Sequence, residues 1–383
     1  MRDYRRYIIG GFSLQGVVFG LGFAVSRSGV LILTGVRGPL DGVWIAASRV
    51  GTGSRYHEGS RMEYEPYTPE IDREKKIVVD GGRSVGLNLS HWPSNATPSE
   101  LRADTSAEIV LNYLKSGQRK SYGDFAIVTN DHYDVDGAIA VWMILNPDSA
   151  EDHTDLLISA ATTGDFERYT SDDALKLAIA IQKFGDKEAS PVADGLRDAQ
   201  DYHAEAAVAY SGVLPEIGGM LADLDGYREL WQEDFDNIKD GLGLFRNGDA
   251  IVDEHEDIEL AIIDTKQRLH RIARFGSTTC DRILTRTGGE WYTLEFTYET
   301  WVIMHSRRPT PRVDLLPLAA ELNEMDDPAT EWTSDIVQAI TPTLKCMSPS
   351  AIPWDTVQET VTSYLRTSIM IPERVWHPYP ETS

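Results

Sequence analysis

The chain has 383 residues, of which 42% are hydrophobic and 25% are charged, so it is long enough for two domains and should bury a core. Acidic residues outnumber basic ones by 60 to 36, and the formal net charge is -24 at pH 7. Such a charge repels polyanions, so we expect no non-specific binding of long DNA or RNA. A small anionic ligand could still bind at a metal-bridged or locally basic site.

The chain has two cysteines, Cys280 and Cys346, and no CxxC pair. This usage is typical of a reducing compartment and gives no zinc motif. We therefore expect a cytoplasmic protein without a disulfide framework.

The first 61 residues differ from the rest of the chain. Three of the first six residues are arginine, and an uncharged run over 7–25 follows them. This pattern imitates a signal peptide or a single membrane anchor, although glycines dilute the run. Residues 1–61 are therefore an upstream or non-native extension, an anchor or signal, or a folded element, with Met62 as an alternative start. Unless 7–25 is a real anchor, we expect no membrane partner.

In the first half of the chain, short apolar runs alternate with segments of helical periodicity. In chain order we predict a strand over 75–80, a helix opened by the capping box Thr105–Glu108, a strand over 125–128, a helix from Ala138, a strand over 156–160 and a helix capped by Ser171.

The second half begins with helical periodicity and ends with mixed elements. We predict helices within 199–245, a strand over 258–263, an alternating strand over 291–304, and helices over 315–322 and 355–365. Together the elements predict an α/β fold with a mainly parallel sheet flanked by helices and a second, smaller α+β lobe. We place the domains at 62–250 and 251–370, followed by a tail over 371–383.

The stretch TNDHYDVDGAIAVW, residues 129–142, places acidic residues between a predicted strand and a predicted helix. Ligand sites of open α/β sheets gather at the carboxyl ends of strands. Asp134 and Asp136 are spaced so that both carboxylates can converge on one hard cation, and Asp131 and His132 could join them. An imidazole widens the choice of metal toward manganese, iron or zinc. The alternative is that Asp136 only caps the helix, because Asp is a common N-cap and turn residue.

The segment His132–Gly137, HYDVDG, resembles the first motif of the DHH phosphoesterase superfamily, particularly the RecJ-type nucleases. The resemblance implies a DHH-phosphoesterase-like fold in which Asp134 and Asp136 hold catalytic divalent metals, manganese or magnesium, with His132 as a further catalytic candidate. His132 stands where RecJ-type proteins have an aspartate, and Asn130 stands where many members have a histidine. The chain has no Asp-His-His triplet and no GGGH segment.

A broader part of the chain is similar to an uncharacterised bacterial family, a domain of unknown function. The similarity is carried by LSHWP, by the acidic turn and by a YETWV–SRRP–RVDL block, and it covers about residues 75 to 366. It supports a start near Met62 and implies a shared fold without an established activity.

Four further residues could contribute to a site. Asp165 and Asp264 each follow a predicted strand, so either could complete the metal site, although Asp165 could also be a turn or helix cap. His270 lies six residues after Asp264, and His91 lies in a loop that could close over a site. Both histidines are candidates for contact with substrate, although a lone histidine is more often packed or exposed without such a role.

The segment SRRPTPR, residues 306–312, is the most basic cluster of the chain. Arg307, Arg308 and Arg312 on a proline-restricted loop suit phosphate or carboxylate binding, or else pair with surface carboxylates. The chain has no Walker A loop, GxGxxG, GxSxG or HExxH motif. The sequence therefore predicts metal-dependent hydrolysis of a small phosphoester or nucleotide. The alternative is a non-catalytic ligand-binding protein that keeps a DHH-like fold without the full metal-ligand set.

Overall fold

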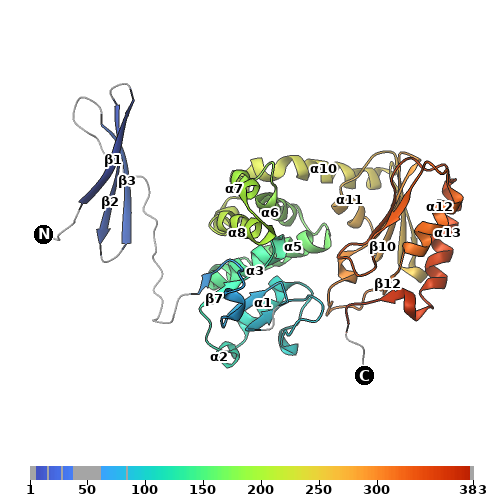
Figure 1. Cartoon of the computed structure of the whole chain (residues 1–383), viewed down its shortest axis with the longest axis horizontal. Coiled ribbons are helices and arrows are strands. Elements are labelled where there is room, and N and C mark those ends of the chain that lie inside the picture. The colour runs from blue at the N-terminus through green and yellow to red at the C-terminus, as the bar shows by residue number, and fades with distance from the viewer. Residues whose placement is uncertain (1–5, 15–16, 27–28, 38–61, 83–84, 380–383) are drawn as a thin grey trace. The chain divides into compact units, whose positions relative to one another are not determined.

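The computed structural model describes residues 6–14, 17–26, 29–37, 62–82 and 85–379 (Figure 1). By their contacts the residues fall into two compact units, 1–60 and 61–383. The remainder of the predicted extension 1–61 and the end of the predicted tail, 380–383, lie outside the described residues. The predicted domain limits stay predictions.

The first unit contains a three-stranded antiparallel sheet of β1 (Arg6–Leu14), β2 (Val17–Ser26) and β3 (Gly29–Arg37). The described part of the uncharged run over 7–25 therefore lies in two strands. None of the helices that the structure describes is long and apolar enough to cross a membrane.

The second unit begins with a four-stranded parallel sheet. Its strands, in the order β4-β7-β5-β6, are β4 (Glu63–Tyr64), β7 (Ile127–Thr129), β5 (Ile77–Val79) and β6 (Leu87–Leu89). All residues of β5 and β6 are buried, which explains the continuous apolar run of β5. Because the strands are parallel, their carboxyl ends lie at one edge of the sheet.

Helices pack around this sheet and continue the chain to residue 247. They are α1 (Ser106–Lys115), α2 (Arg119–Tyr122), α3 (Val135–Leu145), α4 (Pro147–Asp152), α5 (Thr154–Phe166), α6 (Asp172–Gln182), α7 (Ala193–Asp198), α8 (Tyr202–Val213), α9 (Ile217–Ala222) and α10 (Arg228–Asn247). Single turns of 3-10 helix are found at Ile71–Arg73, Ser99–Leu101, Lys183–Gly185, Leu224–Tyr227, Glu256–Ile258, Tyr298–Thr300 and Pro372–Arg374.

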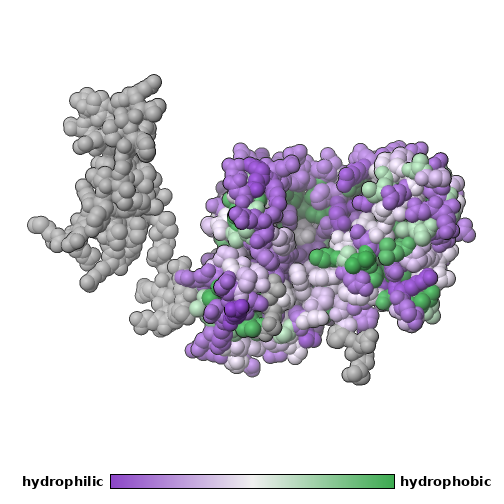
Figure 2. Space-filling model, viewed as in Figure 1, coloured by the Kyte–Doolittle hydropathy of each residue, from purple (hydrophilic) through white to green (hydrophobic). Residues whose placement is uncertain are grey.

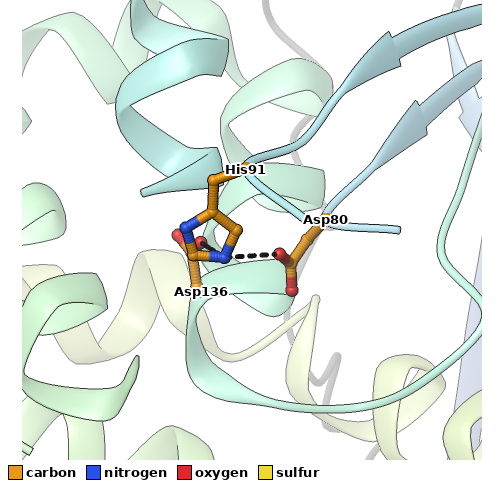
Figure 3. Close-up of side chains that lie close together, drawn as sticks. All are labelled: Asp80, His91 and Asp136. Carbon is orange, nitrogen blue, oxygen red and sulfur yellow. Dashed lines mark ion pairs between the residues drawn. The ribbon is translucent and has the colours of Figure 1, made fainter. Parts of the chain in front are cut away.

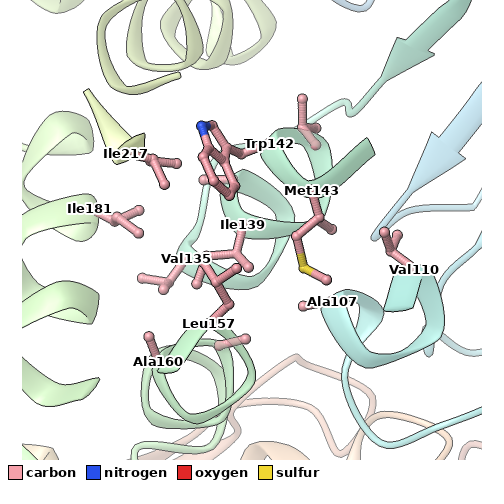
Figure 4. Close-up of a cluster of buried hydrophobic side chains, with 14 of the residues drawn as sticks. Ala107, Val110, Val135, Ile139, Trp142, Met143, Leu157, Ala160, Ile181 and Ile217 are labelled. Atoms are coloured by element: carbon pink, nitrogen blue, oxygen red, sulfur yellow. The ribbon is translucent and has the colours of Figure 1, made fainter. Parts of the chain in front are cut away.

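Helix α3 lies at the centre of this part and is buried along ten of its eleven residues. Its apolar side chains contact residues of α1, α5, α6 and α9 (Figure 4). Full burial of each large aliphatic side chain contributes about 1.5–3 kcal/mol. The acidic turn is therefore attached to the most deeply packed helix of the fold, which fixes its position.

A six-stranded mixed sheet forms the rest of the second unit. Its strands, in the order β13-β14-β11-β10-β9-β8, are β13 (Trp332–Ser334), β14 (Thr343–Cys346), β11 (Trp291–Phe296), β10 (Arg282–Thr287), β9 (Leu260–Thr265) and β8 (Ile251–His255). Only the β9–β10 pair is parallel within the described sheet. A short antiparallel pair joins β12 (Arg312–Val313) to β15 (Val375–Trp376).

Helices cover both faces of the six-stranded sheet (Figure 1). On one face, α11 (Arg271–Phe275) packs Phe275 against Ile263 and Ile283. On the other face, α12 (Leu316–Met325) and α13 (Trp354–Ser368) cover a larger apolar core that includes Leu284 and Leu294. The predicted α/β class, with a parallel sheet and a second mixed part, is confirmed.

Two predicted elements are wrong. Residues 156–160 form no strand but lie inside α5, where Leu157 and Ala160 face the core. A five-residue apolar run cannot be distinguished from a buried piece of helix by periodicity alone. The alternating strand predicted over 291–304 ends at Phe296, and a turn of 3-10 helix follows it at Tyr298.

Candidate metal centre

Side chains from three strand ends meet at the carboxyl edge of the parallel sheet. Asp80 directly follows β5, His91 comes two residues after β6, and His132, Asp134 and Asp136 follow β7. They form two sets that could each hold a metal ion, and within each set the ligand atoms lie within 4.8 Å of one another. The sets are Asp80–His91–Asp136, drawn in Figure 3, and Asp80–His132–Asp134.

Asp80 is the residue that the two sets share. Its Oδ1 lies 3.3 Å from Nε2 of His91, and its Oδ2 lies 3.1 Å from Nε2 of His132. Its backbone has a φ of 46°, in the left-handed region that costs free energy for a residue other than glycine. A carboxylate with one oxygen toward each of two histidines can bridge two cations.

Asp165 joins the first set from the last turn of α5. Its Oδ2 lies 3.3 Å from Nε2 of His91. Three buried polar atoms at this point have no hydrogen-bond partner among the described residues: Asp80 Oδ2, His91 Nε2 and Asp165 Oδ2. Leaving buried polar atoms without partners costs roughly 1–3 kcal/mol each. One cation between Asp80 Oδ2 and His132, and a second between His91 and Asp165, would satisfy these three atoms, so the residues fit metal ions. We call Asp80, His91, His132, Asp134, Asp136 and Asp165 the Asp80 cluster.

The two aspartates of the acidic turn are fixed by the starts of two helices. Asp134 caps α3, because its Oδ1 accepts a hydrogen bond of 2.8 Å from the backbone N–H of Gly137. Asp136 accepts hydrogen bonds from the backbone N–H groups of Ser106 (2.6 Å) and Ala107 (2.8 Å) at the start of α1. The alternative that Asp136 only caps the helix is therefore wrong, because Asp134 is the cap of α3. Asp134 Oδ2 still points to His132 at 2.9 Å.

The histidines are oriented through their second ring nitrogens. His91 Nδ1 lies 2.5 Å from the backbone oxygen of Asp104, which can only accept a hydrogen bond. In the neutral ring, Nδ1 therefore carries the hydrogen and Nε2 presents its lone pair to the cluster. Asp131 Oδ1 lies 3.2 Å from Nδ1 of His132 and orients that ring. Histidine ligands of metals are commonly held in this way.

Burial and mutual repulsion shift the protonation of the carboxylates. Burial, followed by the charge of Asp80, raises the pKa of Asp136 to about 7. Burial and the neighbouring aspartates raise the pKa of Asp165 well above its usual value. For Asp80, burial opposes ionisation, but the imidazoles of His132 and His91 beside its carboxylate outweigh burial and lower its pKa. Without a cation, the cluster therefore takes up protons near neutral pH.

This protonation predicts how cations stabilise the protein at different pH. Because the pKa of Asp136 is higher in the folded state (about 7) than the ordinary 3.8, protonation of this group stabilises the metal-free folded protein increasingly as the pH falls from 8 to 6. A cation competes with that proton. We expect saturating MnCl2 to raise the melting temperature more at pH 8 than at pH 6, as measured by differential scanning fluorimetry. The Asp136→Asn variant should lose most of this difference, and equal rises at both pH values in the unmodified chain would contradict the assignment.

The family model of DUF6687, a family of unknown function, matches residues 60–374. The chain belongs to this family. The prediction of an uncharacterised family is confirmed, and the whole Asp80 cluster lies within the part that the DUF6687 model matches. Comparison with curated proteins and with solved structures found no match.

Asp264 and His270, predicted as metal and substrate residues, lie outside the Asp80 cluster of this DUF6687 protein. Asp264 lies within β9 and pairs with Arg286, its Oδ1 2.8 Å from Nε. His270 caps α11, and its Nδ1 accepts a hydrogen bond of 3.1 Å from the backbone N–H of Ile272. Both belong to the six-stranded sheet and its helix, so they occupy a different sheet edge from the acidic turn.

The arginine loop makes mostly internal contacts. Arg307 pairs with the buried Asp281 at 2.7 Å. Arg312 is itself buried and donates hydrogen bonds to Thr300 Oγ1 and to backbone oxygens of the loop near Ile340. Arg308 lies over the ring of Tyr379, 4.7 Å from its centroid, and has no carboxylate partner among the described residues. Two of the three guanidinium groups are therefore engaged by the protein itself.

Sequence reasoning placed His91 near a site but did not select Asp80. One sequence feature could have indicated Asp80, because it lies directly after a buried strand and before Gly81-Gly82. The acidic turn of this DUF6687 chain was predicted as a site from the same position after a strand. Asp165 was predicted as a site residue because it follows a predicted strand. In the structure it lies in the last turn of helix α5 and reaches the cluster from there.

Proposed function

We propose that this DUF6687 protein is a hydrolase of small phosphoesters that works with two divalent cations held by the Asp80 cluster. The observation that carries the proposal is that Asp80 directs one carboxylate oxygen to each of two histidines, in two ligand sets that have no other member in common. Two-metal sites of hydrolases commonly share such a bridging group.

The ligand set favours manganese. Aspartate oxygens suit magnesium, calcium and manganese alike, whereas imidazole nitrogen suits transition metals better than magnesium. Each proposed metal set contains one histidine. We therefore expect manganese to bind more tightly than magnesium, although both should bind.

The two sets differ in access. The side chains of Asp80, His91 and Asp136 are wholly buried, whereas those of His132 and Asp134 are 9% and 28% exposed. Trp92 packs on His132 with 4.8 Å between ring centroids, and Trp301 packs edge-on against Trp92. A substrate would therefore approach from the His132–Asp134 side, beside these two tryptophan rings.

The chemistry follows from the groups at the cluster. Bound divalent cations would supply a water molecule of lowered pKa and neutralise charge on a phosphoryl oxygen. The chain holds the ligands in place through the start of α1, the carbonyl of Asp104 and the carboxylate of Asp131. The resemblance of HYDVDG to the first DHH motif adds a reason to propose phosphoester hydrolysis rather than another reaction of metal-bound water.

The test measures hydrolysis with defined metal content. The full chain is treated with EDTA, reloaded with MnCl2 or MgCl2, and assayed for release of p-nitrophenolate from bis(p-nitrophenyl) phosphate and p-nitrophenyl phosphate. We expect hydrolysis only after reloading, and a decrease of more than about tenfold in His132→Ala. Asp264→Asn is the matched control, because Asp264 lies outside the cluster.

The second candidate function is a non-catalytic binding protein. It is favoured by the internal contacts of Arg307 and Arg312, which leave no pair of arginines free to clamp a phosphate in that loop. Full metal content without hydrolysis of either ester would support this function. Absence of bound metal after reloading would contradict both the hydrolase and its metal site.

A further inference from the structure

A cleft of about 1050 Å³ lies against the six-stranded sheet and shares no residue with the Asp80 cluster. Its volume is at the upper end of the range for small-molecule sites. Part of its floor is one face of the sheet, where neighbouring strands place Thr285 opposite Thr293, and Thr293 opposite Lys345. Helix α11 packs on the same face further along, through Phe275 and Ile283. The cleft is therefore the uncovered and polar part of an otherwise packed sheet face.

The cleft carries more positive than negative groups. Its lining contains four permanent cations, Arg268, Arg271, Arg274 and Lys345, and two carboxylates, Glu167 and Glu295. The whole chain, in contrast, has a net charge of -24, and most of the surface drawn in Figure 2 is hydrophilic. A local excess of positive charge in such a protein is a place where an anion would bind.

Both carboxylates of the cleft are already neutralised. Arg271 Nε lies 2.7 Å from Glu167 Oε1, and Arg271 Nη1 lies 2.8 Å from Glu295 Oε1. Arg274 donates to the other oxygen of Glu295. The side chains of Arg268 and Lys345 are exposed and make no hydrogen bond, ion pair or ring contact with any residue that the structure describes. These two cations are therefore available to a ligand.

An aromatic side chain stands in the same cleft. Trp291 is 46% exposed, although large aromatic residues are usually buried. It begins β11 opposite Thr287, the last residue of β10, and Arg268 follows the end of β9. Strands β9 and β10 are parallel, so Arg268 and Trp291 lie near the carboxyl ends of parallel strands, where ligands of α/β proteins bind. An exposed indole offers a face on which a flat ring can stack.

We propose that this cleft binds a phosphorylated small molecule that carries a flat ring and has about the size of a nucleotide. Arg268 and Lys345 provide the charge for the phosphate, and Trp291 provides the stacking surface for the ring. Because the cleft and the Asp80 cluster have no residue in common, this binding needs no divalent cation and stands independently of the proposed hydrolysis.

The test uses isothermal titration calorimetry on the full chain in EDTA. The probes are AMP, ribose 5-phosphate, which lacks the base, and adenosine, which lacks the phosphate. We expect AMP to bind more tightly than either fragment. Arg268→Ala and Lys345→Ala should each weaken AMP binding about tenfold, because each removes a charge-assisted hydrogen bond. Trp291→Leu should weaken AMP more than ribose 5-phosphate.

The controls change cations of the same kind elsewhere. Arg246→Ala on α10 and Lys120→Ala on α2 alter exposed residues outside the cleft lining, and they should leave AMP binding unchanged. Melting temperatures of all variants confirm that they fold. No binding of AMP at millimolar concentration, or equal binding of AMP by the unmodified chain, Arg268→Ala and Lys345→Ala, would overturn the proposal. A loss of AMP binding in Asp80→Asn in EDTA would also overturn it, by placing the ligand at the metal cluster.

Discussion

Asp80→Asn should remove both cations from the Asp80 cluster, whereas His91→Ala and His132→Ala should each remove one. The reason is that Asp80 belongs to both ligand sets and each histidine belongs to only one. Asparagine has nearly the same shape, and its oxygen can still accept the hydrogen bond of 2.8 Å from Ser106 Oγ, so the fold should persist. Hydrolysis should decrease by more than about 100-fold, since even the loss of a group that only orients a ligand costs 10–100-fold.

The measurement is metal content by mass spectrometry after loading with MnCl2 and desalting. The unmodified chain should retain two manganese ions, the histidine variants one, and Asp80→Asn none. Asp264→Asn, the same change at an ion-paired aspartate of β9, should retain both. Retention of one ion by Asp80→Asn would show that the two sets bind independently, and the bridging role would be wrong.

Gly164→Ala should destabilise the fold and weaken metal binding together. A Cβ atom at Gly164 would lie 2.4 Å from Cβ of Val135 and 2.8 Å from both of its Cγ atoms, so α5 and α3 would have to separate. Val135 stands between Asp134 and Asp136, and Gly164 precedes Asp165. Overpacking of this kind costs about 1–3 kcal/mol. The separation would also move Asp165 from its position 3.3 Å from His91.

The matched control is Gly243→Ala in α10. The nearest atom to a Cβ there is Arg246 Nη2 at 3.8 Å, so the methyl group fits. Alanine should then stabilise the helix by about 0.4–1 kcal/mol, because it restricts the unfolded chain. Thermal unfolding should show shifts of opposite sign for the two variants, and titration with MnCl2 should show weakened binding only in Gly164→Ala. Unchanged stability and manganese affinity in Gly164→Ala would contradict the close packing of α3 on α5.

The sequence predicted that the acidic turn lies between a strand and a helix, because all the residues that indicate this lie in one short segment. An apolar run, four polar side chains that could bind a cation and the start of a helix stand within fourteen residues, and the strand-end rule applies directly. The same rule applied equally to Asp80 and Asp264. It cannot tell which strands belong to one sheet, and pairing between distant segments decides that. Asp80 follows β5, next to β7, whereas Asp264 belongs to the second sheet.

The contacts of charged side chains were harder to predict from sequence. Asp281, which engages Arg307, is not near it in the chain, and the backbone oxygens that hold Arg312 belong to a loop near residue 340. From the sequence alone, the arginines of residues 306–312 were therefore predicted to be available to a ligand. Asp165 was predicted for a wrong reason, since its segment is a helix and not a strand, yet the last turn of α5 places its carboxylate 3.3 Å from His91.

The positions of the cluster residues along the chain bear on biosynthesis. All six lie between Asp80 and Asp165, whereas the strands of the second sheet begin at Ile251. During translation, which proceeds at about 5–20 residues per second, the whole ligand set leaves the ribosome well before the second sheet exists. A cation captured at that stage would neutralise the crowded carboxylates of the nascent domain. Under the proposed function, manganese supply during synthesis, and not only during turnover, should therefore influence how much folded protein a cell accumulates.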